Sequence, residues 1–188
     1  KIMECQMCMM TSNDGRHWSR FKNSEGNSRI FISPGEVRDP CLIKIDELWH
    51  LYYTGHELIN KEILPGVFVR TSSDLINWTK YTLVHRDRSP RFGKNYWDTE
   101  CPHVVERSGY YYLFRTENYP TAKTHVFRSK NPYDFGIGSA EDKYIGMINT
   151  AAPEIIVDQD GQEYITSNHD LDGGTRMCRL KWVEDRQG

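Results

Sequence analysis

The stretch VRDPCLIKIDELWHLYY at residues 37–53 returns twice along the chain, as ECPHVVERSGYYYLF at 100–114 and as APEIIVDQDGQEYIT at 152–166. Each copy opens on an acidic residue beside a proline and continues through an apolar strand. It then turns at charged or glycine residues and enters a second strand, which is rich in aromatic side chains in the first two copies. Self-similarity of this kind is the signature of a repeat architecture, so the fold is predicted to be built from one repeated unit.

Sequence beyond these copies extends the same unit. After the second strand, a polar loop is expected to lead to a third strand, at 67–70 in the first unit and at 125–128 in the second. That strand ends in a serine and a turn, SSDLINW at 72–78 and SKNPYDF at 129–135, and a half unit ends in the similar TSNDGRHW at 11–18. The predicted units have the approximate bounds 1–36 (partial), 37–98, 99–150 and 151–188.

The spacing of the repeats predicts the architecture. The prolines at positions 40, 102 and 153 give repeats of 62 and 51 residues. Short strands, frequent turns and a period of roughly 50 to 60 residues are typical of β-propeller blades, which have four strands each. The chain is therefore predicted to be all-β, a single propeller domain over residues 1–188 with about three and a half four-stranded blades. Such a set does not close a ring, so we expect a fragment.

The repeated turns have a physical explanation. Asp14, Asp74 and Asn131 occupy matching positions, and such side chains hydrogen-bond the backbone two residues on and close a tight turn. The aromatic residues that end the three turns are predicted to pack between neighbouring blades: Trp18, Trp78 and Phe135.

Composition excludes several classes of function. The 24 Lys and Arg against 26 Asp and Glu give a net charge of -2, so the chain has no excess of positive charge with which to bind nucleic acid. The longest aromatic and aliphatic run, at 110–114, is far shorter than the roughly 20 apolar residues that span a bilayer. A soluble protein with no membrane contact is expected. The five cysteines lack the spacing of a disulfide scaffold or a zinc site, so they do not decide the cellular compartment of the protein.

Acidic residues mark the start of each first strand: Asp39, Glu100 and Glu154. The first strand of a blade lines the central channel, so these side chains are predicted to converge at the axis. Crowded carboxylates cost stability, whereas glycoside hydrolysis requires one protonated and one ionised carboxyl group. Because side chains alternate with a period of two, Asp39 and Glu154 are expected to share an orientation that Glu100 lacks, unless the strand entry differs between the units.

Two motifs and the turn between them resemble a known family. The segments VRDP at 37–40 and WDTECP at 97–102 resemble the RDP and EC motifs of glycoside hydrolase family 32, the β-fructosidases. The segment GVFVRTSSDLINW at 66–78 resembles the blade signature of the superfamily that family 32 shares with family 43. The resemblance covers most of residues 9 to 182 and implies a five-bladed propeller.

The resemblance also implies roles for individual residues. Asp39 is similar to the aspartate that stabilises the transition state, and Glu100 to the general acid/base. Arg38 would hold Asp39 ionised and reach sugar hydroxyls, a task suited to the forked guanidinium. The further residues expected to contact the substrate are Trp97, Asp98, His103, Glu154 and, beside Asp170, His169.

The chain departs from family 32 at the nucleophile. That family carries a nucleophilic aspartate in a Trp-x-Asn-Asp-Pro motif on its first blade, and this sequence has none. The segment Asn13-Asp14-Gly15 is no substitute, because it belongs to an outer turn that recurs at Asp74. Either the nucleophile precedes the chain or the chemistry differs.

The sequence thus predicts a glycoside hydrolase acting on a furanoside or similar small glycoside. An inverting arabinosidase or xylosidase, a glycoside phosphorylase and a non-catalytic carbohydrate-binding propeller remain alternatives. No cofactor or metal is required, although the superfamily allows a calcium ion at the axis. The expected partner is a small carbohydrate, and the oligomeric state stays open.

Overall fold

The structure is a computed structural model that describes residues 4–93, 95, 97–117, 119–168 and 174–183. In this part of the chain every regular element is a β-strand except one 3₁₀ turn, η1 (Tyr119–Thr121). The all-β prediction is confirmed. None of the described residues belongs to a helix long and apolar enough to cross a membrane.

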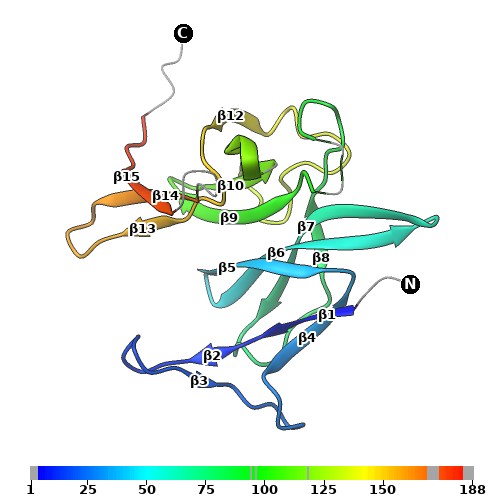
Figure 1. The fold of residues 1–188 in the computed structure, drawn as a ribbon, viewed down its shortest axis with the longest axis vertical. Helices are drawn as coiled ribbons and strands as arrows, with labels where there is room; N and C mark the ends of the chain where they lie inside the picture. Colours follow the sequence, from blue (N-terminus) through cyan, green and yellow to red (C-terminus); the bar gives the residue numbers. More distant parts are fainter. Residues whose placement is uncertain (1–3, 94, 96, 118, 169–173, 184–188) are drawn as a thin grey trace.

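Two complete antiparallel sheets of four strands form the middle of the molecule, and each follows the chain in order (Figure 1). The first contains β5 (Val37–Ile45), β6 (Leu48–Ile59), β7 (Glu62–Ser72) and β8 (Thr82–His85). The second contains β9 (Glu100–Arg107), β10 (Tyr110–Glu117), β11 (Lys123–Ser129) and β12 (Tyr144–Ile148). Four-stranded meanders of this kind are what the predicted propeller blades require. The sequence anticipated four strands per blade but did not locate the outer strands β8 and β12.

Partial sheets flank the two complete blades (Figure 1). Strand β1 (Glu4–Cys8) pairs with β4 (Arg29–Pro34), and β2 (Met10–Thr11) pairs with β3 (Ser19–Arg20). The last sheet has three strands: β13 (Ile155–Val157), β14 (Glu163–Asn168) and β15 (Thr175–Arg179). All sheet boundaries fall within the four predicted units.

The prediction of a polar loop between the second and third strands of the first full unit is wrong. Strands β6 and β7 continue past it and pair without a break from Trp49 with Ser72 to Ile59 with Glu62. The two connecting residues, Asn60 and Lys61, both have positive φ, at 52° and 68°. A two-residue connection with positive φ at both positions matches the right-handed twist of a hairpin, which lets the strands run on.

The apolar cores lie between consecutive sheets. One core joins the β1–β4 sheet to the β5–β8 blade: Met7, Phe31, Val37, Leu51, Tyr53 and Phe68. A second joins the β5–β8 blade to the β9–β12 blade: Cys41, Tyr52, Val67, Val69, Val84, Phe92, Val104, Leu113, Phe127, Phe135 and Ala140. On β6, Tyr52 faces one core while its neighbours on either side face the other, because successive side chains of a strand point to opposite faces. Each blade is therefore held by the blades beside it.

The predicted turn chemistry is confirmed in all three copies. Oδ1 of Asp14 accepts the Arg16 N–H at 2.8 Å, and Oδ1 of Asp74 accepts the Ile76 N–H at 2.9 Å. The side chain of Asn131 accepts the Tyr133 N–H at 3.0 Å. These short polar side chains replace backbone hydrogen bonds that a tight turn cannot make.

The prediction that an aromatic residue packs between blades is confirmed at two turns. Trp78 meets Phe31 of the preceding sheet edge-on, with ring centroids 6.0 Å apart, and Phe135 is fully buried against Tyr52. For Trp18 the prediction is wrong, because 57% of that residue is exposed. No aromatic partner of Trp18 is found among the described residues.

Candidate active site

The first strand of each blade is interrupted at the same point, the step before its proline. Asp39, Cys101 and Ala152, the residues that precede the three prolines, have φ values of 56°, 47° and 47°. This left-handed backbone costs a side-chain-bearing residue about 1–2 kcal/mol. The step is a bulge: the register of β5 against β6 shifts between Arg38 and Cys41, and that of β10 against β9 shifts between Phe114 and Thr116.

The last blade shows the same irregularity. The Thr166 N–H bonds to the carbonyl of Glu154, and the Asn168 N–H to that of Ala151, so three residues on one side span two on the other. Bulges occur beside active sites, where they re-aim side chains. The repeat therefore includes a backbone device as well as a sequence pattern.

The bulge overturns the expected orientation of the three acidic residues. Asp39 is the left-handed residue of its blade, Glu100 stands one residue before that position, and Glu154 stands two residues after it. Asp39 and Glu100 nevertheless both lie beside Arg38, whereas the Glu154 carboxylate lies against His103. The strand entry is the condition on which the expected orientation depended, and the bulge resets the alternation of side chains at this step.

Arg38 joins the two principal carboxylates. Its Nη2 donates to Oε1 of Glu100 at 3.0 Å, and its Nε lies 3.6 Å from Oδ2 of Asp39. A third carboxylate that sequence reasoning missed, Glu36, accepts from Nη1 at 2.5 Å. All four side chains are largely buried, with 25% or less of each exposed. We call Glu36, Arg38, Asp39 and Glu100 the Arg38 cluster.

The electrostatics of the Arg38 cluster single out Glu100. Burial raises the pKa of Glu100 above its ordinary value, and the negative charges of Asp39 and Glu36 add to the rise, while Arg38 opposes it. Burial disfavours a charged carboxylate because protein replaces the water that would solvate it. Glu100 therefore keeps its proton to a higher pH than an ordinary glutamate does.

Cys101 binds the two strands of the cluster together. Its backbone N–H donates to Oδ2 of Asp39 at 3.0 Å, and its Sγ lies 2.9 Å from the hydroxyl of Tyr119, a contact in which either atom can donate. Burial and the nearby Asp39 carboxylate raise the pKa of the Cys101 thiol to about 12. At neutral pH the thiol is uncharged, so it is not a nucleophile.

Trp97 is the predicted substrate contact that lies against the Arg38 cluster. The Arg38 guanidinium is 5.5 Å from the centre of its ring, within the range of a cation–π interaction. The residue is 57% exposed, so much of its aromatic surface faces outward.

The structure does not bring Asp98 into the Arg38 cluster. Its Oδ2 accepts the Asn95 N–H at 2.7 Å, and its carbonyl oxygen accepts a hydrogen bond from the buried Arg115. Only 7% of Asp98 is exposed. Its carboxylate closes the loop that precedes β9, and its contact with substrate stays a prediction.

His103 and Glu154 form a separate row with Cys41. Each of these residues stands two positions after the left-handed residue of its blade. Nδ1 of His103 lies 3.8 Å from Sγ of Cys41 and 2.8 Å from Oε2 of Glu154, and Nε2 accepts the Ile155 N–H at 3.1 Å. Nδ1 is thus the ring nitrogen that faces Cys41 and Glu154, and Nε2 is the one that faces the Ile155 N–H. His103 thus links three consecutive blades, and neither residue joins the Arg38 cluster.

The remaining sequence predictions have different outcomes. His169 and Asp170 lie outside the described residues. Glu36 was missed, although a signal existed: it stands two residues before Arg38, on the same side of an extended chain. Tyr119 was missed because it follows β10 in sequence and reaches Cys101 only through the fold. The exclusion of Asp14 as a nucleophile agrees with its place in an exposed turn.

The described residues do not fit a metal centre. Among them, no three His, Cys, Asp or Glu side chains are grouped so as to hold a metal ion. The calcium ion that the family resemblance allows at the axis stays a prediction.

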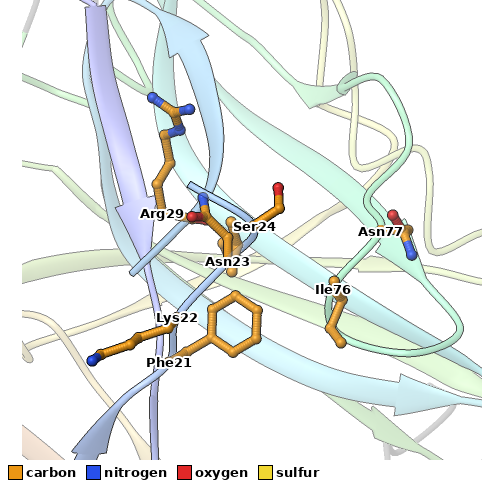
Figure 2. Close-up of a pocket in the computed structure, with 8 residues that line it drawn as sticks. Phe21, Lys22, Asn23, Ser24, Arg29, Ile76 and Asn77 are labelled. Carbon is orange, nitrogen blue, oxygen red and sulfur yellow. The ribbon is translucent and has the colours of Figure 1, made fainter. Parts of the chain in front are cut away.

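A cavity of about 470 Å³ is lined by residues outside the Arg38 cluster (Figure 2). Its walls are the segment at 21–24, the start of β4, and the turn that carries Ile76 and Asn77. The residues that line it include no carboxylate, and it shares none with the Arg38 cluster. The paired acids, and not this cavity, therefore define the candidate site.

Comparison with known proteins supports the fold. No family model matches the sequence, and no curated protein matches it. Solved structures do match. A thermostable family-43 glycoside hydrolase has a TM-score of 0.73 at 16% identity, with 96% of this chain and 64% of that chain covered.

Two further matches represent the two families named in the resemblance, one match for each family. An exo-β-1,3-galactanase from Clostridium thermocellum has a TM-score of 0.56 at 21% identity, covering 86% of this chain and 36% of that one. A family-32 β-fructofuranosidase from Bombyx mori, solved with sucrose, has a TM-score of 0.57 at 19% identity, covering 84% and 35%. The chain spans less than two thirds of each of these three structures. It has the β-propeller fold found in glycoside hydrolases of families 43 and 32, represented by part of a ring.

Proposed function

We propose that this chain is part of a glycoside hydrolase in which Glu100 is the general acid and Asp39 stabilises the transition state. The observation that carries the proposal is the pairing of two carboxylates of unequal character around Arg38. Glu100 is buried and has a raised pKa, whereas Asp39 accepts a backbone N–H from Cys101. Carboxyl groups held in different environments are what acid-catalysed glycoside cleavage requires.

In the proposed mechanism Glu100 donates its proton to the glycosidic oxygen as the bond to the sugar breaks. The leaving group then departs as a neutral alcohol, and positive charge develops on the sugar ring. The Asp39 carboxylate lies beside the same guanidinium and supplies the negative charge that stabilises this centre. The carboxylate or water that attacks the sugar is not assigned.

Arg38 and Trp97 would orient the sugar. A guanidinium offers several donors in a fixed plane, which suits hydroxyl groups as well as carboxylates. The exposed Trp97 ring offers an apolar face beside it. We infer a furanoside or similar small glycoside as substrate, and the Bombyx mori enzyme with sucrose is consistent with this class.

An inverting arabinosidase or xylosidase would use the same two carboxylates on the same fold. A phosphorylase is less well supported, because phosphate requires additional positive charge and Arg38 is the one cation in the Arg38 cluster. A carbohydrate-binding propeller without catalysis would not require a carboxylate whose pKa is raised by burial. The experiment below separates it from an enzyme.

Glu100→Gln tests the proposal, because glutamine keeps the shape and cannot donate a proton. Hydrolysis of chromogenic arabinofuranosides, xylosides and galactosides, and of sucrose, is measured alongside sugar binding by calorimetry. We expect turnover to fall by about 10²–10⁴-fold with binding retained. Activity should recover in part on dinitrophenyl glycosides, whose leaving group needs no proton.

Glu57→Gln is the matched control. Glu57 also pairs with an arginine, Arg86 at 2.9 Å, and its side chain is 23% exposed, as is that of Glu36. It should retain full turnover. Equal rates for Glu100→Gln and the parent chain would refute the assignment of Glu100, and turnover in the parent chain would exclude a binding module without catalysis.

A further inference from the structure

Glu36 is brought to the Arg38 cluster by the link between two sheets. It stands between β4 and β5, directly after Gly35, whose φ is 76°. A Cβ at Gly35 would lie 2.9 Å from Cβ of His56, so the close approach of the two backbones requires glycine at that position. The turn thus fixes where the Glu36 side chain begins.

Glu36 and Glu100 hold opposite nitrogens of one guanidinium. Nη1 of Arg38 contacts Oε2 of Glu36 at 2.5 Å, and Nη2 contacts Oε1 of Glu100 at 3.0 Å. The Trp97 ring lies against the same guanidinium. A planar group that is held at both ends in this way has little freedom to turn, and its single positive charge is divided between the two acids.

We propose that Glu36 is a positioning residue that acts on Glu100 through Arg38. It fixes the guanidinium so that Nη2 meets Glu100, and it takes up part of the positive charge that would otherwise favour ionised Glu100. Glu100 thereby keeps a proton available for transfer. The role of Glu36 in catalysis rests on the proposed function, but its effect on the protonation of Glu100 does not.

The charged and titratable groups around Glu100 come from five segments. They are Glu36 from the β4–β5 link, Arg38 and Asp39 from β5, Cys101 from β9, Tyr119 from η1, and His56 from β6, which faces Glu36 and Arg38. Burial lowers the pKa of His56 to about 4, and it raises the pKa of Cys101 and of Tyr119. These three groups are therefore uncharged near neutral pH, which leaves Glu36, Asp39 and Arg38 to set the charge around Glu100.

Glu36→Gln isolates the charge from the geometry. A glutamine oxygen still accepts from Nη1, while the negative charge is gone. Arg38 then shares its charge with one carboxylate fewer, and a carboxylate that repels ionised Glu100 is removed, so both effects lower the pKa of Glu100. The titration midpoint of Glu100 is expected to move to lower pH.

The measurement is a carboxyl titration by NMR on the full chain labelled with ¹³C-glutamate. The Glu100 signal is identified by its loss in Glu100→Gln. Glu57→Gln serves as the control, because it removes an equally exposed, arginine-paired glutamate and should leave the Glu100 midpoint in place. If Glu36→Gln does not fold, Glu36→Ala removes the same charge with a smaller side chain and carries the same prediction.

A downward shift in the Glu36 variant alone supports the inference. An unchanged or raised midpoint overturns it, as does an equal shift in Glu57→Gln. The titration uses no substrate, so the inference can fail while glycosidase activity is found, and it can hold while that activity is absent. In an active enzyme the alkaline limb of the pH profile of kcat/KM should move to lower pH by the same amount.

Discussion

At the scale of single residues, Glu100 combines a functional advantage with a cost. Burial raises its pKa in the folded chain, so the fold favours its protonated form. A group whose pKa is higher folded than unfolded contributes stability below its unfolded pKa and loses that contribution as pH rises through the folded value. At neutral pH the folded chain therefore contains a carboxylate that it would hold more easily as a neutral group.

Glu100→Gln is therefore expected to stabilise the chain at neutral pH. Glutamine does not titrate, and Arg38 keeps its contacts with Glu36 and Asp39. The gain in Tm over the parent chain should be present at pH 7 and should shrink toward pH 4, where Glu100 regains its proton. Thermal unfolding across this pH range measures it. A Tm below that of the parent at pH 7 would contradict the raised pKa.

The site could be predicted from the sequence only as far as motifs reach. The RDP and EC segments placed Asp39 and Glu100 in the same site, and the structure brings both to Arg38. Proximity in sequence did not fix orientation, however. Asp98 and His103 flank the EC motif, yet their polar atoms are used by a loop and by the junction of the blades.

At the scale of elements, the bulged first strands decide which side chains meet. An uninterrupted strand would place residues of odd and even number on opposite faces. The left-handed step before each proline removes that rule locally, which is why Glu154 lies with His103 and not with Glu100. Sequence periodicity could not reveal this, because the residues at the step are different in every blade.

His103→Ala is expected to weaken the junction of three blades. It removes the acceptor of the Ile155 N–H and the partner of Glu154, in a residue that is 8% exposed. An unpaired donor and the space left behind should cost about 2 kcal/mol in the free energy of unfolding. Urea denaturation measures the change.

His17→Ala is the control for that experiment. The His17 side chain is 90% exposed and pairs with Asp14 in an outer turn. Removing an exposed pair should lower the free energy of unfolding much less than His103→Ala does. Equal losses in the two variants would show that His103 has no special part in joining the blades.

At the scale of the whole molecule, stability resides in the contacts between sheets. The two cores each draw residues from neighbouring sheets, so a blade contributes most where another blade covers it. The repeat, the strand type and the propeller fold were predictable from sequence, because they depend on local patterns that recur. The extended β6–β7 hairpin and the exposure of Trp18 could not be predicted, because both depend on which other parts of the molecule lie beside these residues.

The two tryptophans that end matching turns separate packing from turn chemistry. The Nε1 of each donates to a carbonyl three residues earlier, at 3.2 Å in Trp18 and 3.0 Å in Trp78. Trp78 also packs on Phe31 across the first core, whereas Trp18 is 57% exposed. Trp78→Ala should cost about 2–3 kcal/mol and Trp18→Ala within about 0.5 kcal/mol. Denaturant unfolding of both variants tests this, and comparable losses would argue against stabilisation between sheets.

The left-handed position before Pro40, Pro102 and Pro153 accepts side chains of different chemistry. The same backbone geometry presents a carboxylate in Asp39, a thiol in Cys101 and a methyl group in Ala152. In these three blades the residue before the proline has a similar φ, whichever side chain it carries. During divergence, a single substitution at this position can introduce or remove a reactive group without any insertion or change of loop length. A repeated scaffold of this kind can evolve new specificities one blade at a time.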